Sequence, residues 1–273
     1  ETGEESLVEL GRVDEIAYNE TIWSARFVED RAYIVTFQNM DPLWTIDLSD
    51  PANPQIMGEL EVPGVSTYIH PLSDASILTI GLGPSDIENG TGLDWSHTRL
   101  SLFNVSNFSN PQLTQTLSVS PVEDPDEGWS WAWSEATWEH KAFQYWAPKG
   151  MLAIPMNTYR YDYFYDSAGN YHYDYDWVSK LMIVNVTEEG LEIHGEVDHS
   201  QFYETDENRW WSSYNIRRSI FMGDYIYAIS HGGITVTNLE TLEESDSHQF
   251  TVFEDSSNDV STNDSTEEDK DEG

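Results

Sequence analysis

The sequence predicts an all-β fold built from repeated units of about four strands each. One observation is a strand–turn–strand pattern at residues 44–63, whose halves are joined by a Ser-Asp-Pro turn. Looser copies of this pattern recur at residues 99–113, 180–193 and 234–242. The other observation is a high content of Trp, Tyr and Phe (11, 15 and 10) with almost no helical periodicity.

Four units follow in chain order. The first has strands at 24–28, 32–37, 43–48 and 55–62, and the second, residues 65–119, has strands at 76–80 and 99–105 around a Gly/Asp-rich loop at 81–97. The third, residues 134–197, carries a long insertion, and the fourth spans residues 215–253. Four antiparallel strands make one propeller blade, so we expect a β-propeller domain over residues 5–253.

The two ends of the chain differ in character. Residues 7–13 alternate like the last strand of a unit, and we expect them to form a strand that helps to close the ring. The four blades either close a small propeller by themselves or belong to a larger ring. Residues 254–273 are Ser, Asn, Asp and Glu with almost no apolar side chains, which predicts a disordered acidic tail.

Composition limits the partners. Asp and Glu outnumber Lys and Arg 50 to 12, and the formal net charge is −38. This charge repels nucleic acid and anionic membranes and favours cations or basic partners, but it also suits solubility in a saline environment. The chain has no Cys, so disulfides and thiolate chemistry are excluded. No apolar stretch approaches the ~20 residues of a membrane span and no signal peptide is present, so we expect no membrane insertion.

Basic or imidazole side chains recur in the first predicted strand of each unit. In three units, this residue lies seven positions before the apolar run of the next predicted strand. In the third unit, the residue has the same place only if the hairpin that follows it contains four extra residues. They are Arg26, His70, Arg218 and, with the extra residues, His140. The innermost strand of a propeller lines its central channel. These residues therefore either bind an anion or water cluster in the channel or tie neighbouring blades together through carbonyls and acidic partners.

Several long motifs resemble the secreted β-propeller domain proteins of archaea and bacteria. They include Ser24-Ala-Arg-Phe-Val-Glu-Asp-Arg-Ala-Tyr-Ile-Val-Thr-Phe, Asp41-Pro-Leu-Trp-Thr-Ile-Asp-Leu-Ser-Asp-Pro-Ala-Asn-Pro, Ser66-Thr-Tyr-Ile-His-Pro, Leu100-Ser-Leu-Phe-Asn-Val-Ser and Arg218-Ser-Ile-Phe-Met-Gly-Asp-Tyr-Ile-Tyr-Ala-Ile-Ser. The resemblance covers residues 5–250. It implies an exported or surface-anchored propeller, distantly similar to WD-repeat propellers and without an assigned activity. It also implies that this chain corresponds to the C-terminal portion of such proteins.

The third unit departs from that family by its aromatic content. Aromatic residues alternate with polar ones on both sides of an Asp-Ser-Ala-Gly-Asn turn, which predicts a long hairpin with one aromatic face. The aromatic positions are Tyr159, Tyr161, Tyr163, Tyr165, Tyr171, Tyr173, Tyr175 and Trp177. Such a face either binds sugar rings or a partner protein, or packs on the neighbouring blade or on Trp129, Trp131 and Trp133. On the binding interpretation, deletion of 159–177 abolishes partner binding and leaves the propeller folded.

The remaining site predictions are weaker. The loop at 86–94 offers oxygen ligands to a hard cation such as Ca²⁺, although its spacing does not fit an EF-hand. The ligands would be Asp86, Glu88, Asn89 and Asp94. No other cofactor is indicated, and no nucleophile elbow or phosphate-binding glycine loop is present. Among 50 acidic residues, a glycosidase pair of carboxylates cannot be identified from spacing.

The sequence therefore predicts a non-catalytic β-propeller at the cell surface or outside the cell, acting as a protein- or glycan-binding scaffold. Its partners would be proteins or glycans of the cell envelope, and the aromatic hairpin would be the contact surface. The alternative is a hydrolase or lyase that acts on cell-surface glycans at the channel mouth, with carboxylates assisted by His70 or His140.

Overall fold

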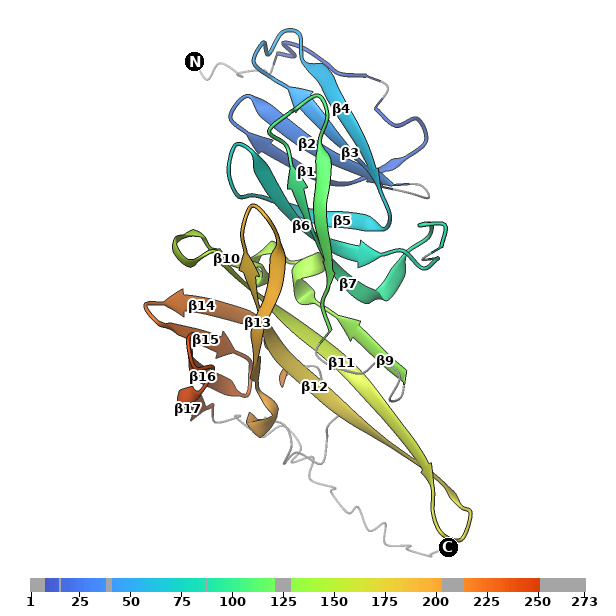
Figure 1. Ribbon diagram of the computed structural model, residues 1–273, viewed down its shortest axis with the longest axis vertical. Coiled ribbons are helices and arrows are strands. Elements are labelled where there is room, and N and C mark those ends of the chain that lie inside the picture. Colours follow the sequence, from blue (N-terminus) through green and yellow to red (C-terminus); the bar gives the residue numbers. More distant parts are fainter. Residues whose placement is uncertain are drawn as a thin grey trace, which may run out of the picture.

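Alternating apolar residues and short polar turns produce four antiparallel sheets in chain order (Figure 1). The computed structural model describes residues 8–14, 16–37, 41–86, 88–120, 129–202 and 214–250. The first two sheets are β1 (Thr21–Val28), β2 (Arg31–Phe37), β3 (Asp41–Asp47), β4 (Gln55–Val62), then β5 (Val65–Pro71), β6 (Ser76–Gly83), β7 (Asp94–Asn104), β8 (Gln112–Ser118). The predicted all-β, blade-like architecture is confirmed.

The third sheet contains the long hairpin. Its strands are β10 (Gln144–Trp146), β11 (Met151–Tyr165), β12 (Tyr171–Val186) and β13 (Leu191–Asp198). A further strand, β9 (Trp129–Trp133), pairs with residues 157–161 in the middle of β11. The fourth sheet is β14 (Arg218–Met222), β15 (Tyr225–Ile229), β16 (Gly233–Asn238) and β17 (Glu244–Gln249). The short 3₁₀ turns that lie wholly within the described ranges include η1 (Glu135–Thr137), η2 (His140–Ala142), η3 (Ala147–Lys149) and η4 (Ser200–Phe202). In the described ranges, no helix has the length and apolar character needed to cross a membrane.

The same polar turn ends the third strand of three sheets. Asp47 Oδ1 accepts a hydrogen bond from Ser49 N at 2.8 Å, and Asn104 Oδ1 accepts one from Ser106 N at 3.0 Å. Asn238 Oδ1 accepts the equivalent bond, from the second residue after it, at 2.9 Å. Short Asp and Asn side chains stabilise tight turns by bonding backbone N–H groups two residues ahead. The sequence repeat thus corresponds to a structural repeat.

Neighbouring sheets pack face to face through three hydrophobic interfaces. Sheets one and two meet through Tyr33, Val35, Leu43, Ile69, Ile77 and Phe103. Sheets two and three meet through Leu78, Leu100, Leu102, Ile154, Met156 and Val184. Sheets three and four meet through Leu181, Ile183, Ile226 and Ala228. Because all of these side chains are buried, the packing of one sheet on the next accounts for the hydrophobic core.

Polar contacts add to each interface. Ser24 Oγ donates to the carbonyl of Ser66 at 2.8 Å between sheets one and two. Gln115 both donates to and accepts from the backbone of Leu191, at 2.9 and 2.8 Å, between sheets two and three. Such bonds fix the position of one sheet on the next, because a buried backbone group that loses its partner is costly.

The four sheets follow an open arc, with the first and fourth sheets at its two ends (Figure 1). Apolar side chains remain exposed on both end sheets: Ile22 (62%) and Phe27 (66%) on β1, and Ile220 (47%) and Met222 (59%) on β14. Among the described residues, no hydrogen bond or ion pair joins these two sheets. The described part of the chain therefore supplies four blades and leaves exposed apolar side chains at each end of the arc.

Two expectations are corrected here. The strand predicted over 7–13 is wrong, because residues 8–14 contain no strand. Gly11 instead lies against the Pro51–Ala52 turn, where an added Cβ would stand 2.4 Å from the Pro51 carbonyl oxygen. The third unit also begins before residue 134, because β9 belongs to its sheet. The predicted acidic tail, residues 254–273, lies outside the described residues.

Candidate functional site

An open recess of about 310 Å³ lies between the second and third sheets, and the described residues that line it are all aromatic. Trp95 belongs to β7, Trp133 to β9 and Tyr159 to β11, while Trp138 follows η1. Trp95 and Trp138 keep 59% and 67% of their surface exposed. Exposed aromatic rings gathered around a concavity are typical of a binding site.

The base of the hairpin forms the rigid wall of this recess. The ring of Trp177 lies 4.3 Å from that of Tyr159 and 5.3 Å from that of Trp133, both edge to face. Only 8% of Trp177 is exposed. Edge-to-face contacts hold aromatic rings in defined orientations, so this wall is preformed.

Aromatic rings continue from the recess toward the first sheet. Trp23 in β1 lies 6.2 Å from Trp95 and 6.0 Å from Phe37, measured between ring centroids. Three sheets therefore contribute rings to one aromatic surface.

Two buried polar atoms lie in the same part of the third sheet. Asn157 Oδ1 and Trp177 Nε1 are buried and have no hydrogen-bond partner in the described part of the chain. Asn157 is on the same face of β11 as Tyr159, because side chains two residues apart in a strand share a face. A buried acceptor or donor without a partner is costly unless water or a ligand satisfies it.

The predicted aromatic hairpin is confirmed as the outer part of the β11–β12 pair, which extends away from the sheets (Figure 1). Its register places the eight aromatic positions in four facing pairs: Tyr159–Trp177, Tyr161–Tyr175, Tyr163–Tyr173 and Tyr165–Tyr171. Tyr165 and Tyr171 at the tip are 69% and 56% exposed. The side chains of the two middle pairs lie outside the described residues.

The tip is closed by a polar turn around Asp166. Its carboxylate accepts hydrogen bonds from the side chain of Asn170 at 2.9 Å and from the backbone of Ala168 at 2.9 Å, and His172 Nε2 lies 3.0 Å away. The bond from the Asn170 side chain, followed by the contact with His172, holds the pKa of Asp166 well below its usual range. The ring of His172 stacks on Phe164 at 5.2 Å. The turn is therefore ordered by its own side chains.

Packing and exposure thus occur at opposite ends of the hairpin. Tyr159 and Trp177 at the base pack on Trp133, whereas Tyr165 and Tyr171 at the tip face solvent. Removing residues 159–177 would therefore damage the third sheet as well as the tip, so a test of binding must shorten only the tip.

The four basic or imidazole residues do not occupy equivalent positions. Arg26 pairs with Tyr33 two residues before the end of β1, whereas Arg218 is the first residue of β14. His70 lies one residue before the end of β5. The expectation that His140 belongs to an innermost strand is wrong, because it lies in η2 and β10 begins at Gln144. The equal spacing of these residues from the next strand does not give equivalent positions, because the strands differ in length and in the position of their β-bulges.

His70 is enclosed by aromatic rings. Its ring lies 5.4 Å from Phe143 and 5.1 Å from Tyr145, and Tyr68 Oη is 3.3 Å from its Nδ1. Burial lowers the pKa of His70, and the positive charge of Arg26 lowers it further. His70 therefore packs among aromatic side chains of the second and third sheets, where burial favours its neutral form.

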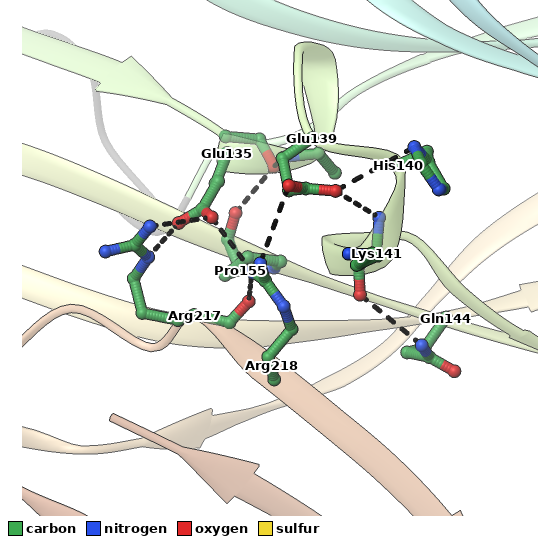
Figure 2. Close-up of polar contacts among 10 residues, drawn as sticks. Glu135, Glu139, His140, Lys141, Gln144, Pro155, Arg217 and Arg218 are labelled. Atoms are coloured by element: carbon green, nitrogen blue, oxygen red, sulfur yellow. Dashed lines mark hydrogen bonds and ion pairs between the residues drawn. The ribbon is translucent and has the colours of Figure 1, made fainter. Parts of the chain in front are cut away.

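Arg218 belongs to a charged cluster that joins the third and fourth sheets (Figure 2). Glu135 Oε1 accepts hydrogen bonds from Arg217 at 3.1 Å and from Arg218 at 2.8 Å, and Arg217 Nε also pairs with the second carboxylate oxygen. Arg218 Nη2 is 3.7 Å from Glu139 Oε2. Only 7% of Glu135 is exposed. These contacts favour the blade-tying interpretation for Arg218, and they occupy both oxygens of Glu135.

The loop at 86–94 is held by its own hydrogen bonds. Asp86 accepts from Asn89 Nδ2 at 2.7 Å and from the backbone of Asn89 at 3.0 Å, and these bonds lower the pKa of Asp86. Asp94 Oδ1 accepts from Ser96 Oγ at 2.6 Å, and Glu88 is exposed. In the described ranges, no group of three or more His, Asp or Glu side chains is placed to hold a metal ion.

Sequence reasoning missed Trp95 and Trp138. Each is a single Trp beside an acidic residue, Asp94 and Glu139 respectively, outside the aromatic repeat of the hairpin. Nothing in their local sequence indicates that they meet, because Trp95 belongs to β7 of the second sheet and Trp138 follows η1 beside the third sheet.

Comparison with known proteins identifies a family and two archaeal relatives. The family model described as "Beta propeller domain" matches residues 3–242. An uncharacterized protein of Methanocaldococcus jannaschii is 29% identical over 221 residues, which cover 81% of this chain and 27% of that protein. An uncharacterized protein of Archaeoglobus fulgidus is 30% identical over 162 residues, which cover 59% and 23%. The chain thus spans about a quarter of the length of these relatives.

Two solved β-propeller domains resemble this chain in structure, with low TM-scores. The β-propeller domain of Cps50 (Swd1) from Myceliophteria thermophila has a TM-score of 0.39 at 8% identity, covering 86% of this chain and 61% of that chain. The β-propeller domain of Nup133 from Vanderwaltozyma polyspora has a TM-score of 0.33 at 9% identity, covering 77% and 53%. Scores this low support no functional argument, so the assignment rests on the family match and the four sheets.

Proposed function

Because the chain belongs to the β-propeller domain family, we propose that it is a non-catalytic binding module that contacts proteins or glycans of the cell envelope. The observation that carries this proposal is the recess lined by Trp95, Trp133, Trp138 and Tyr159. Its inner wall is preformed and its outer rings are exposed, as expected where a ligand covers aromatic surface. The exposed tip of the hairpin would supply a second contact.

A location at the cell surface is part of the same proposal. It is supported by the resemblance to secreted propeller proteins. The net charge of −38 also agrees with it, because a high charge keeps a protein soluble in a saline environment outside the cell. Cleavage of the protein by a protease added to intact cells would test it. Complete protection in intact cells, with cleavage after lysis, would contradict it.

The binding experiment compares three tagged proteins on a native cell-envelope extract. These are the intact chain, a Trp95→Ala/Trp138→Ala variant, and a variant in which residues 162–174 are replaced by a two-residue turn. We expect the intact chain to retain a protein or glycan that the double variant loses. Tyr18→Ala is the matched control, because Tyr18 is 86% exposed and lies outside the recess.

The outcomes separate the two contact surfaces. Loss of retention only in the shortened variant would assign binding to the tip, and loss only in the Trp variant would assign it to the recess. Equal retention by all variants would overturn the proposed contact surface.

A further inference from the structure

We propose that the aromatic recess binds a quaternary or otherwise alkylated ammonium group. This inference rests on the proposed binding function and specifies its ligand. The recess is formed by Trp95, Trp133, Trp138 and Tyr159. It would take a small organic cation, such as choline, or the alkylated amino group of a larger molecule.

The first argument is the chemistry of the rings. The face of an aromatic ring is negative, and indole attracts cations more strongly than phenol or phenyl does. Three of the four rings are indoles, and those of Trp95 and Trp138 are more than half exposed. Recesses of several aromatic rings are a recurrent solution for binding alkylated ammonium groups.

The second argument is the polarity of the recess. None of the described lining residues carries a charge, and their polar groups are limited to indole N–H and a phenol hydroxyl. A simple ammonium ion is strongly hydrated and would lose its water without replacement. In an alkylated ammonium group, methyl groups surround the positively charged nitrogen and weaken its hydration. Such a group is therefore attracted to the aromatic rings and costs little free energy to desolvate.

A neutral sugar fits this lining less well. Its hydroxyl groups need hydrogen-bond partners when they are buried, and polar groups at fixed positions orient most small ligands. The described lining offers few such partners. The net charge of −38 also raises the local concentration of cations and does nothing for a neutral ligand.

Size and surroundings agree with this assignment. The volume of about 310 Å³ is at the lower end of the ~300–1,000 Å³ found for small-molecule pockets. Asn157 Oδ1, an acceptor without a partner among the described residues, is on the same strand face as Tyr159. The carbonyl dipole of Asn157 adds negative potential at this wall, and the indole N–H of Trp177 in the same part of the sheet, also without a partner among the described residues, offsets a part of it.

The test measures binding of choline by tryptophan fluorescence and calorimetry. Choline is compared with 3,3-dimethylbutan-1-ol, an uncharged molecule of the same shape, and with cellobiose. We expect saturable binding of choline and at least about tenfold weaker binding of the uncharged molecule. Raising the salt concentration from about 0.15 M to about 1 M should weaken choline binding, because it screens the field of the protein.

Variants separate the recess from the rest of the surface. Trp138→Ala should reduce the affinity for choline by about tenfold, whereas Trp138→Phe, which keeps a weaker aromatic face, should have an affinity between those of Trp138→Ala and the unaltered protein. Because Trp138 is 67% exposed, both variants should remain folded, which circular dichroism verifies. Tyr18→Ala should bind as the unaltered protein does. A peptide with trimethyl-lysine, beside the same peptide with lysine, shows whether the recess also accepts an attached group.

Some results would overturn the inference. Equal affinity for choline and its uncharged analogue would show that shape and hydrophobicity suffice. Binding of cellobiose without choline, lost in Trp138→Ala, would replace the cation with a sugar and leave the proposed binding function intact. Absence of choline binding together with unchanged retention of envelope material by the Trp95→Ala/Trp138→Ala variant would exclude the recess altogether.

Discussion

The indole of Trp177 and the phenol ring of Tyr159 face each other across the β11–β12 pair, with ring centroids 4.3 Å apart and planes at 67°. This contact lies where the third sheet becomes the projecting hairpin. It joins the buried part of the sheet to the aromatic recess, so the same pair contributes to folding and shapes the candidate site.

Truncation of Trp177 should therefore destabilise the protein. Only 8% of Trp177 is exposed and its ring packs on Tyr159 and Trp133, so Trp177→Ala should lower the free energy of unfolding by about 3–5 kcal/mol. Tyr165→Ala, at the 69% exposed tip, should cost less than about 1 kcal/mol. Urea denaturation of both variants measures the difference. Equal costs would show that Trp177 is not part of the core.

Removal of the negative charge of Glu135 should lower the free energy of unfolding. Glu135→Gln removes the negative charge and replaces one of the two buried acceptor oxygens that pair with Arg217 and Arg218 by an amide donor. Because both arginines are partly exposed, we expect a loss of about 2 kcal/mol, below the full cost of breaking a buried pair. Asp224→Asn, which breaks the exposed pair with Lys149, is the control and should cost at most about 1 kcal/mol. A cost for Glu135→Gln no larger than that of the control would contradict a tying role.

His199 should make stability depend on pH. It is fully buried against Phe202, neither ring nitrogen has a hydrogen-bond partner in the described part of the chain, and burial lowers its pKa to about 4. The unfolded chain protonates His199 near pH 6.5 and the folded chain only near pH 4, so protons favour the unfolded state between these values. From pH 7 to pH 5, this residue should remove about 2 kcal/mol of stability.

A His199→Phe variant isolates this effect from the carboxylates. Its loss of stability between pH 7 and pH 5, measured by urea denaturation, should be about 2 kcal/mol smaller than that of the unaltered protein. Identical pH dependence in the two proteins would show that His199 is protonated in the folded state as readily as in the unfolded state.

The outer face of the fourth sheet should tolerate substitution better than its inner face. Ile226 in β15 is fully buried against the third sheet, whereas Ile220 in β14 is 47% exposed. Ile226→Ala should lower the free energy of unfolding by about 2–5 kcal/mol, and Ile220→Ala should lower it by less than about 1 kcal/mol. Thermal unfolding of the two variants provides the comparison. Similar costs would show that the outer face of the sheet is covered in solution.

Part of the candidate site could be predicted from the chain. The alternation of aromatic and polar residues around the turn at Asp166 was sufficient to place Tyr159 opposite Trp177, because strand periodicity and a tight turn determine a register. The same method failed for His140. Equal spacing from a following strand says nothing of an intervening 3₁₀ turn, and η2 removed His140 from the strand that sequence spacing had assigned to it.

The sequence by itself determined the repeat and its local structure. Asp47, Asn104 and Asn238 form the same turn in three sheets because each bonds the backbone two residues ahead, an interaction that needs no distant partner. The period of two in a strand likewise set which side chains of each strand share a face.

Only the tertiary structure decided which residues meet between sheets. Trp95 and Trp138 lie 43 positions apart, in the second and third units, and share one recess because two sheets pack face to face. Glu135 likewise meets Arg217 and Arg218, more than 80 positions away, between the third and fourth sheets. Such contacts depend on the relative placement of whole sheets, which results from the packing of many side chains at once and is not encoded in any local pattern.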